Sequence, residues 1–136
     1  MVSNAFLAHF AVVAVRKSMS AGSLINSTKQ FALEIIRFVG ALPSTKTCNV
    51  IGSQLLRAGT SVGANYRSSC RAKSLADFTA KMKVVEEECD ESVYWLELLV
   101  EAGEVRAELA SGLMCEASQI LSMTVASIRT ARLHKP

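Results

Sequence analysis

The sequence predicts an all-α fold, an antiparallel, left-handed four-helix bundle with up-down-up-down topology. Half of the 136 residues are hydrophobic, 6% are aromatic and only two are prolines, a composition that favours helices over sheets. Apolar residues recur at intervals of three and four along four successive segments, as they do on one face of a helix. The connections between these segments are short, so neighbouring helices must run antiparallel.

A chain of this length fits one domain with a single core, and we assign that domain to residues 23–136. Residues 1–22 are a separate N-terminal extension. Its apolar run, residues 5–15, is shorter than the roughly 20 residues that cross a membrane. Its positive charge follows the run, whereas a secretory signal carries it first. The extension is either an extra helix packed on the bundle or on a neighbour, or a leader read from an upstream start, since Met19 would serve equally well as a first residue.

The first bundle helix is expected to begin near Ser27, which stands three residues before Gln30 in the form of a capping box. Its apolar face consists of residues spaced three or four apart: Phe31, Ile35, Phe38 and Leu42. The helix must end by Leu42, because Pro43 disfavours the helical conformation in the residue before it.

The second helix is expected from about residue 47 to about residue 73. Its inner stripe consists of apolar residues at helical spacing: Ile51, Leu55, Ala58, Val62 and Tyr66. The middle of this helix is rich in small residues, among them Gly59 and Gly63, and each glycine costs roughly 1 kcal/mol relative to alanine. The glycines therefore indicate either close packing of another backbone or a kink that faces a ligand.

The third helix is predicted from a cap at Ser74, with Asp77 three residues later, through to Glu101. A heptad seam runs along it: Leu75, Phe78, Met82, Val85, Cys89, Ser92, Leu96 and Leu99. Further apolar residues lie off that seam and form a second surface, suited to a neighbouring helix or subunit. We predict an oligomer interface from this surface and the acids beside it: Tyr94, Trp95, Leu98, Glu87 and Glu91. Gly103 is expected to end the helix in the left-handed conformation.

The fourth helix is expected from about Glu104 or Arg106 to Arg132. Its apolar stripe is Leu109, Leu113, Ala117, Ile120, Thr124 and Ile128. Basic residues near its end, Arg129 and Arg132, suit the negative end of the helix dipole.

Charge is unevenly distributed along the chain. Residues 1–73 contain nine Lys and Arg residues and one acid, a net charge of +8, and residues 74–136 contain six Lys and Arg residues and eleven acids, a net charge of −5. Such segregation suits an anionic ligand, and it also suits pairing of basic with acidic faces within or between subunits. Both explanations remain open at this point.

No residue pattern typical of a catalytic or metal site is present. Di-iron bundles need Glu-x-x-His pairs in the core, but His9 and His134 both lie outside the predicted bundle helices. The four cysteines have no C-x-x-C spacing and do not suit a zinc site: Cys48, Cys70, Cys89 and Cys115. We expect them to be reduced thiols in a cytoplasmic protein. The acidic run at residues 86–91 reads as a solvated or partner-facing stripe. We therefore expect no enzymatic activity, cofactor, metal, small-molecule substrate or membrane partner.

A group of basic residues is the remaining candidate site. Arg67 and Arg71 are four apart on one helical face, with further cations before and after them. Such a group can contact phosphates in a sequence-independent, salt-sensitive way, while one nearby aromatic gives little support for base stacking. The predicted nucleic-acid site is Arg57, Arg67, Arg71, Lys73, Lys81, Lys83 and Tyr66.

The run from Leu55 to Leu99 resembles the family named four helix bundle protein, also known as the protein of intervening sequences in the large ribosomal RNA gene. The matching elements are R-A-G-T-S-V-G-A-N-Y-R at 57–67, R-A-K-S-x-x-D-F at 71–78 and Y-W-L-E-L-L at 94–99. The resemblance covers roughly residues 24–132. It implies a ring-like homopentamer, because members form such rings. It also implies RNA or DNA as a partner, because a related accessory protein of diversity-generating retroelements works with a reverse transcriptase and nucleic acid.

Carried over by this resemblance, the polar or basic motif positions are Arg57, Asn65, Tyr66, Arg67, Arg71 and Lys73. The sequence departs from the family at residues 68–69, where relatives more often carry an acidic and a small residue. It also departs at the glutamates of residues 86–88, which make the third helix more repulsive to phosphate. The N-terminal extension has no counterpart in the family.

Taken together, these observations lead to the hypothesis of a non-enzymatic, homo-oligomeric bundle whose basic first two helices contact RNA or DNA in an accessory role. The alternative is a structural or protein-interaction scaffold without a nucleic-acid role. In that case the same arginines would pair with the acidic residues 86–91 of a neighbouring subunit.

Overall fold

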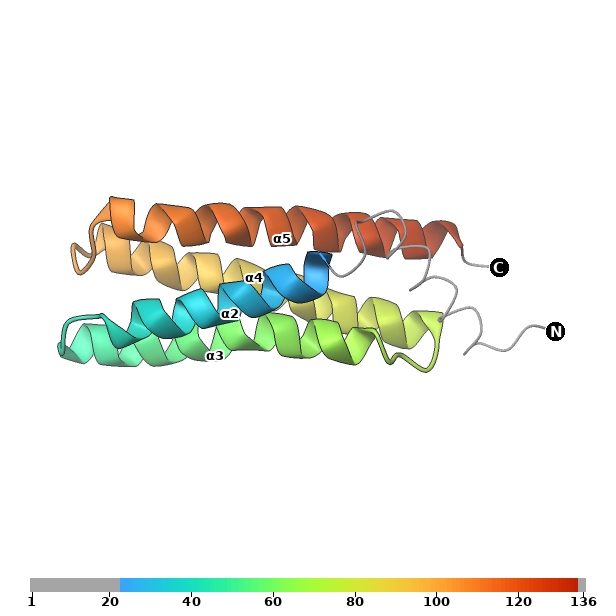
Figure 1. Cartoon of the computed structure of the whole chain (residues 1–136), viewed down its shortest axis with the longest axis horizontal. Coiled ribbons are helices and arrows are strands. Elements are labelled where there is room, and N and C mark those ends of the chain that lie inside the picture. The colour runs from blue at the N-terminus through green and yellow to red at the C-terminus, as the bar shows by residue number, and fades with distance from the viewer. Residues whose placement is uncertain (1–22, 135–136) are drawn as a thin grey trace.

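The computed structural model describes residues 23–134 and consists of four α-helices joined by short connections. The helices are α2 (Ser23–Gly40), α3 (Lys46–Ser69), α4 (Leu75–Glu101) and α5 (Ala107–Leu133). They lie side by side and alternate in direction (Figure 1), which confirms the predicted all-α, antiparallel four-helix bundle. The predictions for residues 1–22, including an extra helix, lie outside the described residues.

Each helix packs on its neighbours in the chain, and α2 also packs on α5, which closes the bundle. The helix α2 has 18 residues, against 27 in each of α4 and α5. At 1.5 Å per residue, α2 is about 27 Å long, and α4 and α5 are each about 40 Å long. It therefore covers only part of the length of the other helices (Figure 1).

The core follows the predicted heptad seam of α4. Apart from Leu75, which is half-buried, every residue of the seam is at most 1% exposed. The hydroxyl of Ser92, fully buried in this seam, donates to the carbonyl of Glu88 at 2.8 Å. Because this hydroxyl is hydrogen-bonded, its burial avoids the free-energy cost of an unpaired polar group in the core.

The helix ends agree best where a side chain caps them. Ser74 accepts a hydrogen bond from the backbone N–H of Asp77 at 3.0 Å, and Gly103 has φ +75°, both as predicted for α4. Thr45 caps α3 by accepting from the N–H of Cys48 at 3.0 Å. These ends are set by local hydrogen bonds, which a sequence displays directly.

Other ends differ from the prediction. The helix α2 begins at Ser23, not at Ser27, and Leu24 in its first turn is 3% exposed. Burial of that turn against the bundle extends the helix, because tertiary packing contributes more to helix stability than a capping motif does. The helix α3 ends at Ser69, where the backbone N–H groups of Arg71 and Ala72 bond to carbonyls three residues earlier. Such bonds tighten the end of a helix into a turn.

The apolar stripe of α5 is correct except at its start. Leu109 is 66% exposed, and the buried stripe begins instead at Ala110. The later members, Leu113 and Ala117, follow from Ala110 in steps of three and four. Leu109 is one residue out of this register, so its side chain points away from the core.

The glycines of α3 allow α2 to approach closely. A Cβ atom at Gly59 would lie 2.8 Å from Cγ1 of Ile35, and one at Gly63 would lie 3.4 Å from the carbonyl oxygen of Thr28. Of the two explanations for these glycines, close packing is therefore confirmed. None of the helices within residues 23–134 has both the length and the apolar character needed to span a bilayer.

Candidate nucleic-acid interface

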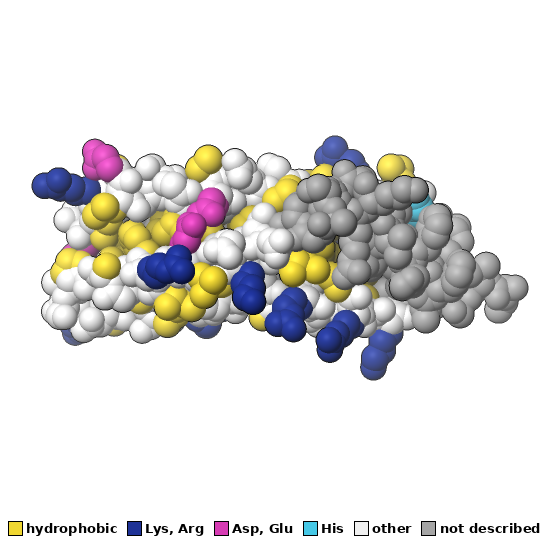
Figure 2. Space-filling view, in the orientation of Figure 1, with side chains coloured by type: hydrophobic (Ala, Val, Ile, Leu, Met, Phe, Trp, Pro, Cys, Tyr) yellow, Lys and Arg dark blue, Asp and Glu magenta, His cyan; other side chains and the backbone are white. Residues whose placement is uncertain are grey.

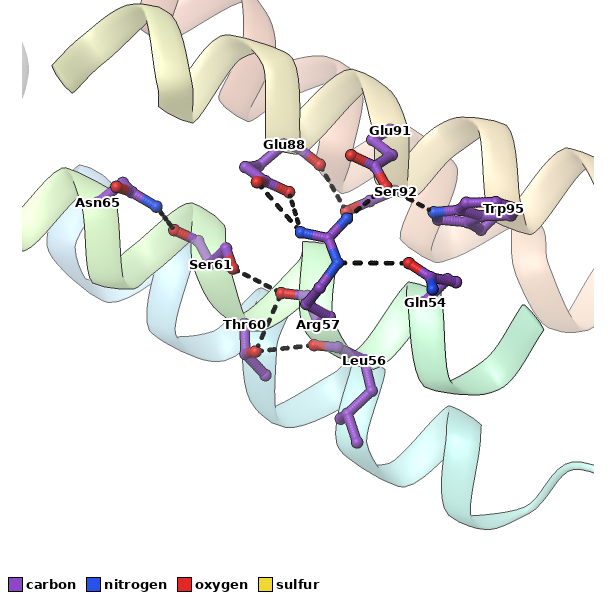
Figure 3. A network of polar contacts seen from close by, with 10 residues as sticks. All are labelled: Gln54, Leu56, Arg57, Thr60, Ser61, Asn65, Glu88, Glu91, Ser92 and Trp95. Atoms are coloured by element: carbon purple, nitrogen blue, oxygen red, sulfur yellow. Dashed lines mark hydrogen bonds and ion pairs between the residues drawn. The ribbon is translucent and has the colours of Figure 1, made fainter. Parts of the chain in front are cut away.

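Arg57 faces α4 and is paired within the chain. One of its terminal nitrogens, Nη1, lies 3.1 Å from Oε2 of Glu88, and the other, Nη2, bonds to Glu91 (Figure 3). Its Nε donates to the side-chain oxygen of Gln54 at 3.3 Å. The hydrogen bond from Arg57 lowers the pKa of Glu91, with a smaller contribution from Trp95. This guanidinium thus joins α3 to α4 and is already bound to two carboxylates.

Some residues of the predicted oligomer interface belong to the network of contacts around Arg57, and the others do not. Trp95 is half-buried, and its Nε1 donates to Glu91 at 3.1 Å (Figure 3). Tyr94 is 51% exposed, and its ring tilts against that of Trp95 with centroids 5.1 Å apart. Leu98 is half-buried and Glu87 is exposed. Tyr94 and Glu87 therefore face outward, while Glu91 and Trp95 form contacts within the chain.

Lys81 is engaged within the chain through its ammonium group, whereas Lys73 is engaged through its backbone and keeps an exposed side chain. Lys81 Nζ lies 3.0 Å from Oδ2 of Asp77, one turn earlier on α4. The backbone N–H of Lys73 donates to the same oxygen at 3.0 Å. These hydrogen bonds, the one from Lys73 first, lower the pKa of Asp77. Tyr66 is 5% exposed, so its ring packs in the core and is not presented for stacking on a base.

Arg67 and Arg71 lie together on a groove between α2 and α3. The groove has a volume of about 590 Å³, and Lys29 of α2 lines it opposite the two arginines. All three cations are exposed, and within residues 23–134 none of them makes an ion pair. Figure 2 shows a row of Lys and Arg side chains along this edge of the molecule. The remaining lining residues are uncharged: Ile25, Thr28, Ala32, Thr60, Gly63, Ala64 and Cys70.

Lys29 is the residue that reasoning from the sequence missed. It stands alone between polar neighbours on the first helix, and nothing in its local sequence links it to Arg67. The signal that could have found it is the small-residue stretch of α3. Because Gly63 packs against Thr28, the next residue of α2 is brought alongside the groove.

Lys83 belongs to the opposite side of the bundle. It lines a hollow between α4 and α5 together with Glu86, Glu87 and Asp90. A second hollow on the same seam has Arg129 and Arg132 around Lys83 and Glu86. This seam is of mixed charge, in contrast to the groove between α2 and α3. The predicted set of basic residues is thus divided over several faces, and only Arg67 and Arg71 share a site.

The Cys89 thiol offers little for nucleophilic chemistry. Burial, with a smaller contribution from Asp90, raises the pKa of Cys89 to about 12, and its Sγ donates to the carbonyl of Ala117 at 3.1 Å. A thiol with so high a pKa is protonated at neutral pH and is a poor nucleophile. Across residues 23–134 no three His, Cys, Asp or Glu side chains are grouped closely enough to hold a metal ion.

Two carboxylates meet where α2 packs on α5. Partial burial, together with a hydrogen bond and repulsion from Glu34, raises the pKa of Glu116 to about 7 from an ordinary value of 4.5. Between these two values the folded protein keeps a proton that the unfolded chain releases. Stability from this pair is therefore present below about pH 4.5 and is lost as the pH rises to 7.

Glu116→Gln removes this titration. We expect the variant to have a higher melting temperature than the parent protein at pH 8, where Glu116 is charged, and an unchanged one at pH 4.5. Thermal unfolding followed by circular dichroism at both pH values measures the difference. Glu97→Gln is the matched control, because Glu97 is exposed on α4, and it should show no such pH dependence. An equal gain at both pH values for Glu116→Gln would contradict the assignment.

Comparison with known proteins places these features in context. The family model described as 23S rRNA-intervening sequence protein matches residues 23–126. A solved structure from Bacteroides thetaiotaomicron, described as a protein with unknown function from the S23 ribosomal protein family, is similar to this chain with a TM-score of 0.74 and 30% sequence identity. The similarity covers 78% of this chain and 98% of that one. Among curated proteins there is no match.

Proposed function

This chain belongs to the 23S rRNA-intervening sequence protein family, and from that premise we propose that it is a non-enzymatic, homo-oligomeric helical bundle that binds nucleic acid. The α2–α3 groove is the proposed contact surface, through Lys29, Arg67 and Arg71. The family description and that of the Bacteroides protein both name ribosomal components, which supports RNA as the partner. Four free cysteines support a reducing, cytoplasmic location.

The single observation that carries the proposal is the uncompensated charge of the groove. Arg67 lies in the last turn of α3 and Arg71 in the turn that follows the helix, and both line the groove. Lys29 adds a third positive charge, and among residues 23–134 no acid lines the groove. Acids of α4 neutralise Arg57 and Lys81 but not these three residues. A concave surface lined by one sign of charge attracts the opposite sign, and phosphate is the anion that a nucleic acid presents most densely.

Arg67→Ala/Arg71→Ala is expected to weaken RNA binding strongly at low salt. Each lost phosphate contact should reduce the slope of log K against log salt by about 1, and the double variant therefore by about 2. Fluorescence anisotropy with a labelled RNA over a range of salt concentrations measures both quantities. Both arginines are exposed, so circular dichroism should show an intact bundle.

The matched control is Arg129→Ala/Arg132→Ala. It removes the same charge from exposed positions on the mixed seam between α4 and α5 and should change neither affinity nor slope by a comparable amount. Absence of RNA binding by the parent protein at low salt would end the nucleic-acid proposal. Dissociation of the oligomer in the Arg67/Arg71 variant would instead favour the alternative scaffold function, in which these arginines pair with a neighbouring subunit.

The oligomer is tested best at Tyr94. The side chain is 51% exposed, so a charge there leaves the monomer folded but would disrupt a subunit contact made by the outer face of α4. We expect Tyr94→Asp to give monomers by light scattering, and Leu109→Asp, at an exposed position of α5, to leave the assembly intact. An unchanged oligomer in Tyr94→Asp would show that the subunit contact is made by another surface. Trp95 is less suitable, because it is half-buried and bonded to Glu91.

A further inference from the structure

We propose that the α2–α3 groove binds the sugar–phosphate backbone of a double-stranded nucleic acid, not the unstacked bases of a single strand. This inference rests on the proposed function and names the class of nucleic acid. It follows from what lines the groove, from how its charges are arranged and from what lies on the far side of the bundle.

Within residues 23–134 the groove has no platform for stacking. Proteins that hold single strands place aromatic rings against successive bases, but none of the described aromatic side chains lines the groove. The nearest candidate from the sequence, Tyr66, is 5% exposed, and Phe31 is fully buried. The exposed ring among residues 23–134 is Tyr94, which belongs to α4 and does not line the groove. A single strand would therefore gain only charge contacts here.

The charges of the groove suit a regular row of phosphates. Arg67 lies in the last turn of α3 and Arg71 in the turn that follows it, and each guanidinium can hold a phosphate through two parallel hydrogen bonds. Lys29 lies on the α2 wall and can contact the same strand from the other side. A duplex presents its phosphates at fixed spacing on a stiff ridge, so the contacts form without first ordering the ligand. A flexible single strand must lose conformational freedom to make them.

The seam between α4 and α5 is of mixed charge and does not extend the contact to a second face. Glu86, Glu87 and Asp90 lie beside Lys83 in one of its hollows and would repel a strand that wrapped around the molecule there. Sequence-independent binding on one face, through cations on an uncharged floor, is the pattern expected for contact with a duplex backbone. A duplex also has the higher charge density, which gives a slope of about −0.9 per phosphate contact against about −0.7 for a single strand.

The test compares two ligands with the full-length protein. A labelled RNA duplex and a labelled poly(U) strand of equal phosphate number are titrated over a range of salt concentrations by fluorescence anisotropy. We expect the duplex to bind several-fold more tightly at low salt, with a slope larger by the ratio of about 0.9 to 0.7. This ratio does not depend on how many grooves of an oligomer are engaged.

Variants locate the contact. Lys29→Ala and Arg67→Ala/Arg71→Ala should each reduce the slope on the duplex, and Arg67→Lys/Arg71→Lys should retain the slope because it keeps the charge. Arg129→Ala/Arg132→Ala, at exposed positions on the mixed seam between α4 and α5, should leave binding of both ligands unchanged. Equal or tighter binding of poly(U) would overturn the inference and leave nucleic-acid binding in place. Failure of both ligands to bind would overturn the proposed function as well.

Discussion

Replacing Phe31 with alanine is expected to lower the free energy of unfolding by about 3 to 5 kcal/mol. Phe31 is fully buried and comes from α2, the shortest helix of the bundle. Removing the ring loses the free energy gained by burying it and leaves a cavity in the core. The cavity cannot close easily, because Ile35 and Gly59 already bring α2 and α3 into contact one turn away. Since whole domains are stable by only about 5 to 15 kcal/mol, this change should be the most damaging of the single substitutions considered.

Equilibrium unfolding in urea at one protein concentration measures the effect. A fixed concentration is needed because dissociation of an oligomer would otherwise contribute to the apparent stability. Ile36→Ala is the matched control, since Ile36 lies on the same helix but is 48% exposed, and it should cost less than about 1 kcal/mol. Similar losses in the two variants would show that Phe31 is not a core residue of the folded protein.

Replacing Gly59 with alanine should also destabilise the bundle, in contrast to the usual effect of this change in a helix. A Cβ atom at this position would lie 2.8 and 2.9 Å from the two γ carbons of Ile35. Those atoms cannot move aside readily, because a β-branched side chain has one preferred rotamer in a helix. Overpacking of about 1 to 3 kcal/mol should exceed the gain of roughly 1 kcal/mol in helix propensity.

The chain contains its own control at Gly112. This glycine lies inside α5, and an added Cβ would meet nothing within 4 Å. Gly112→Ala should therefore stabilise the protein by up to roughly 1 kcal/mol. Combining Gly59→Ala with Ile35→Ala should make the Gly59 change less costly than it is alone, a coupling that a double-mutant cycle measures. Stabilisation by Gly59→Ala in the parent protein would refute the close approach of α2.

The sequence anticipated α4 better than the other helices. Ser74 caps its start, Gly103 ends it, and the heptad seam between them is buried as predicted. Both ends depend on hydrogen bonds and backbone conformations within a few residues, and the seam repeats without interruption. The predicted start of α2 is wrong, because burial of Leu24 extends that helix beyond its capping motif. A long-range contact of this kind has no local signature.

The candidate site shows a similar limit. The sequence pairs Arg67 with Arg71 through a spacing of four on one helical face. The helix α3 ends at Ser69, so Arg71 lies in the turn that follows, but both residues line the same groove. Arg57 was grouped with them, but its side chain turns toward Glu88 and Glu91 on the neighbouring helix. Lys29 was left out, although it shares their groove. In both cases the deciding contact joins residues that are more than thirty positions apart in the chain.

By itself, the sequence determined the bundle and the separation of charge between the two halves of the chain. These features depend on periodicity, on short connections and on composition, which are properties of neighbouring residues. Only the tertiary structure decided which cations the acids of α4 neutralise and which remain on a common surface. The physical reason is that charge neutralisation depends on distances of a few ångströms between helices. Rotation and register between helices set these distances, and they arise from packing that the whole bundle determines together.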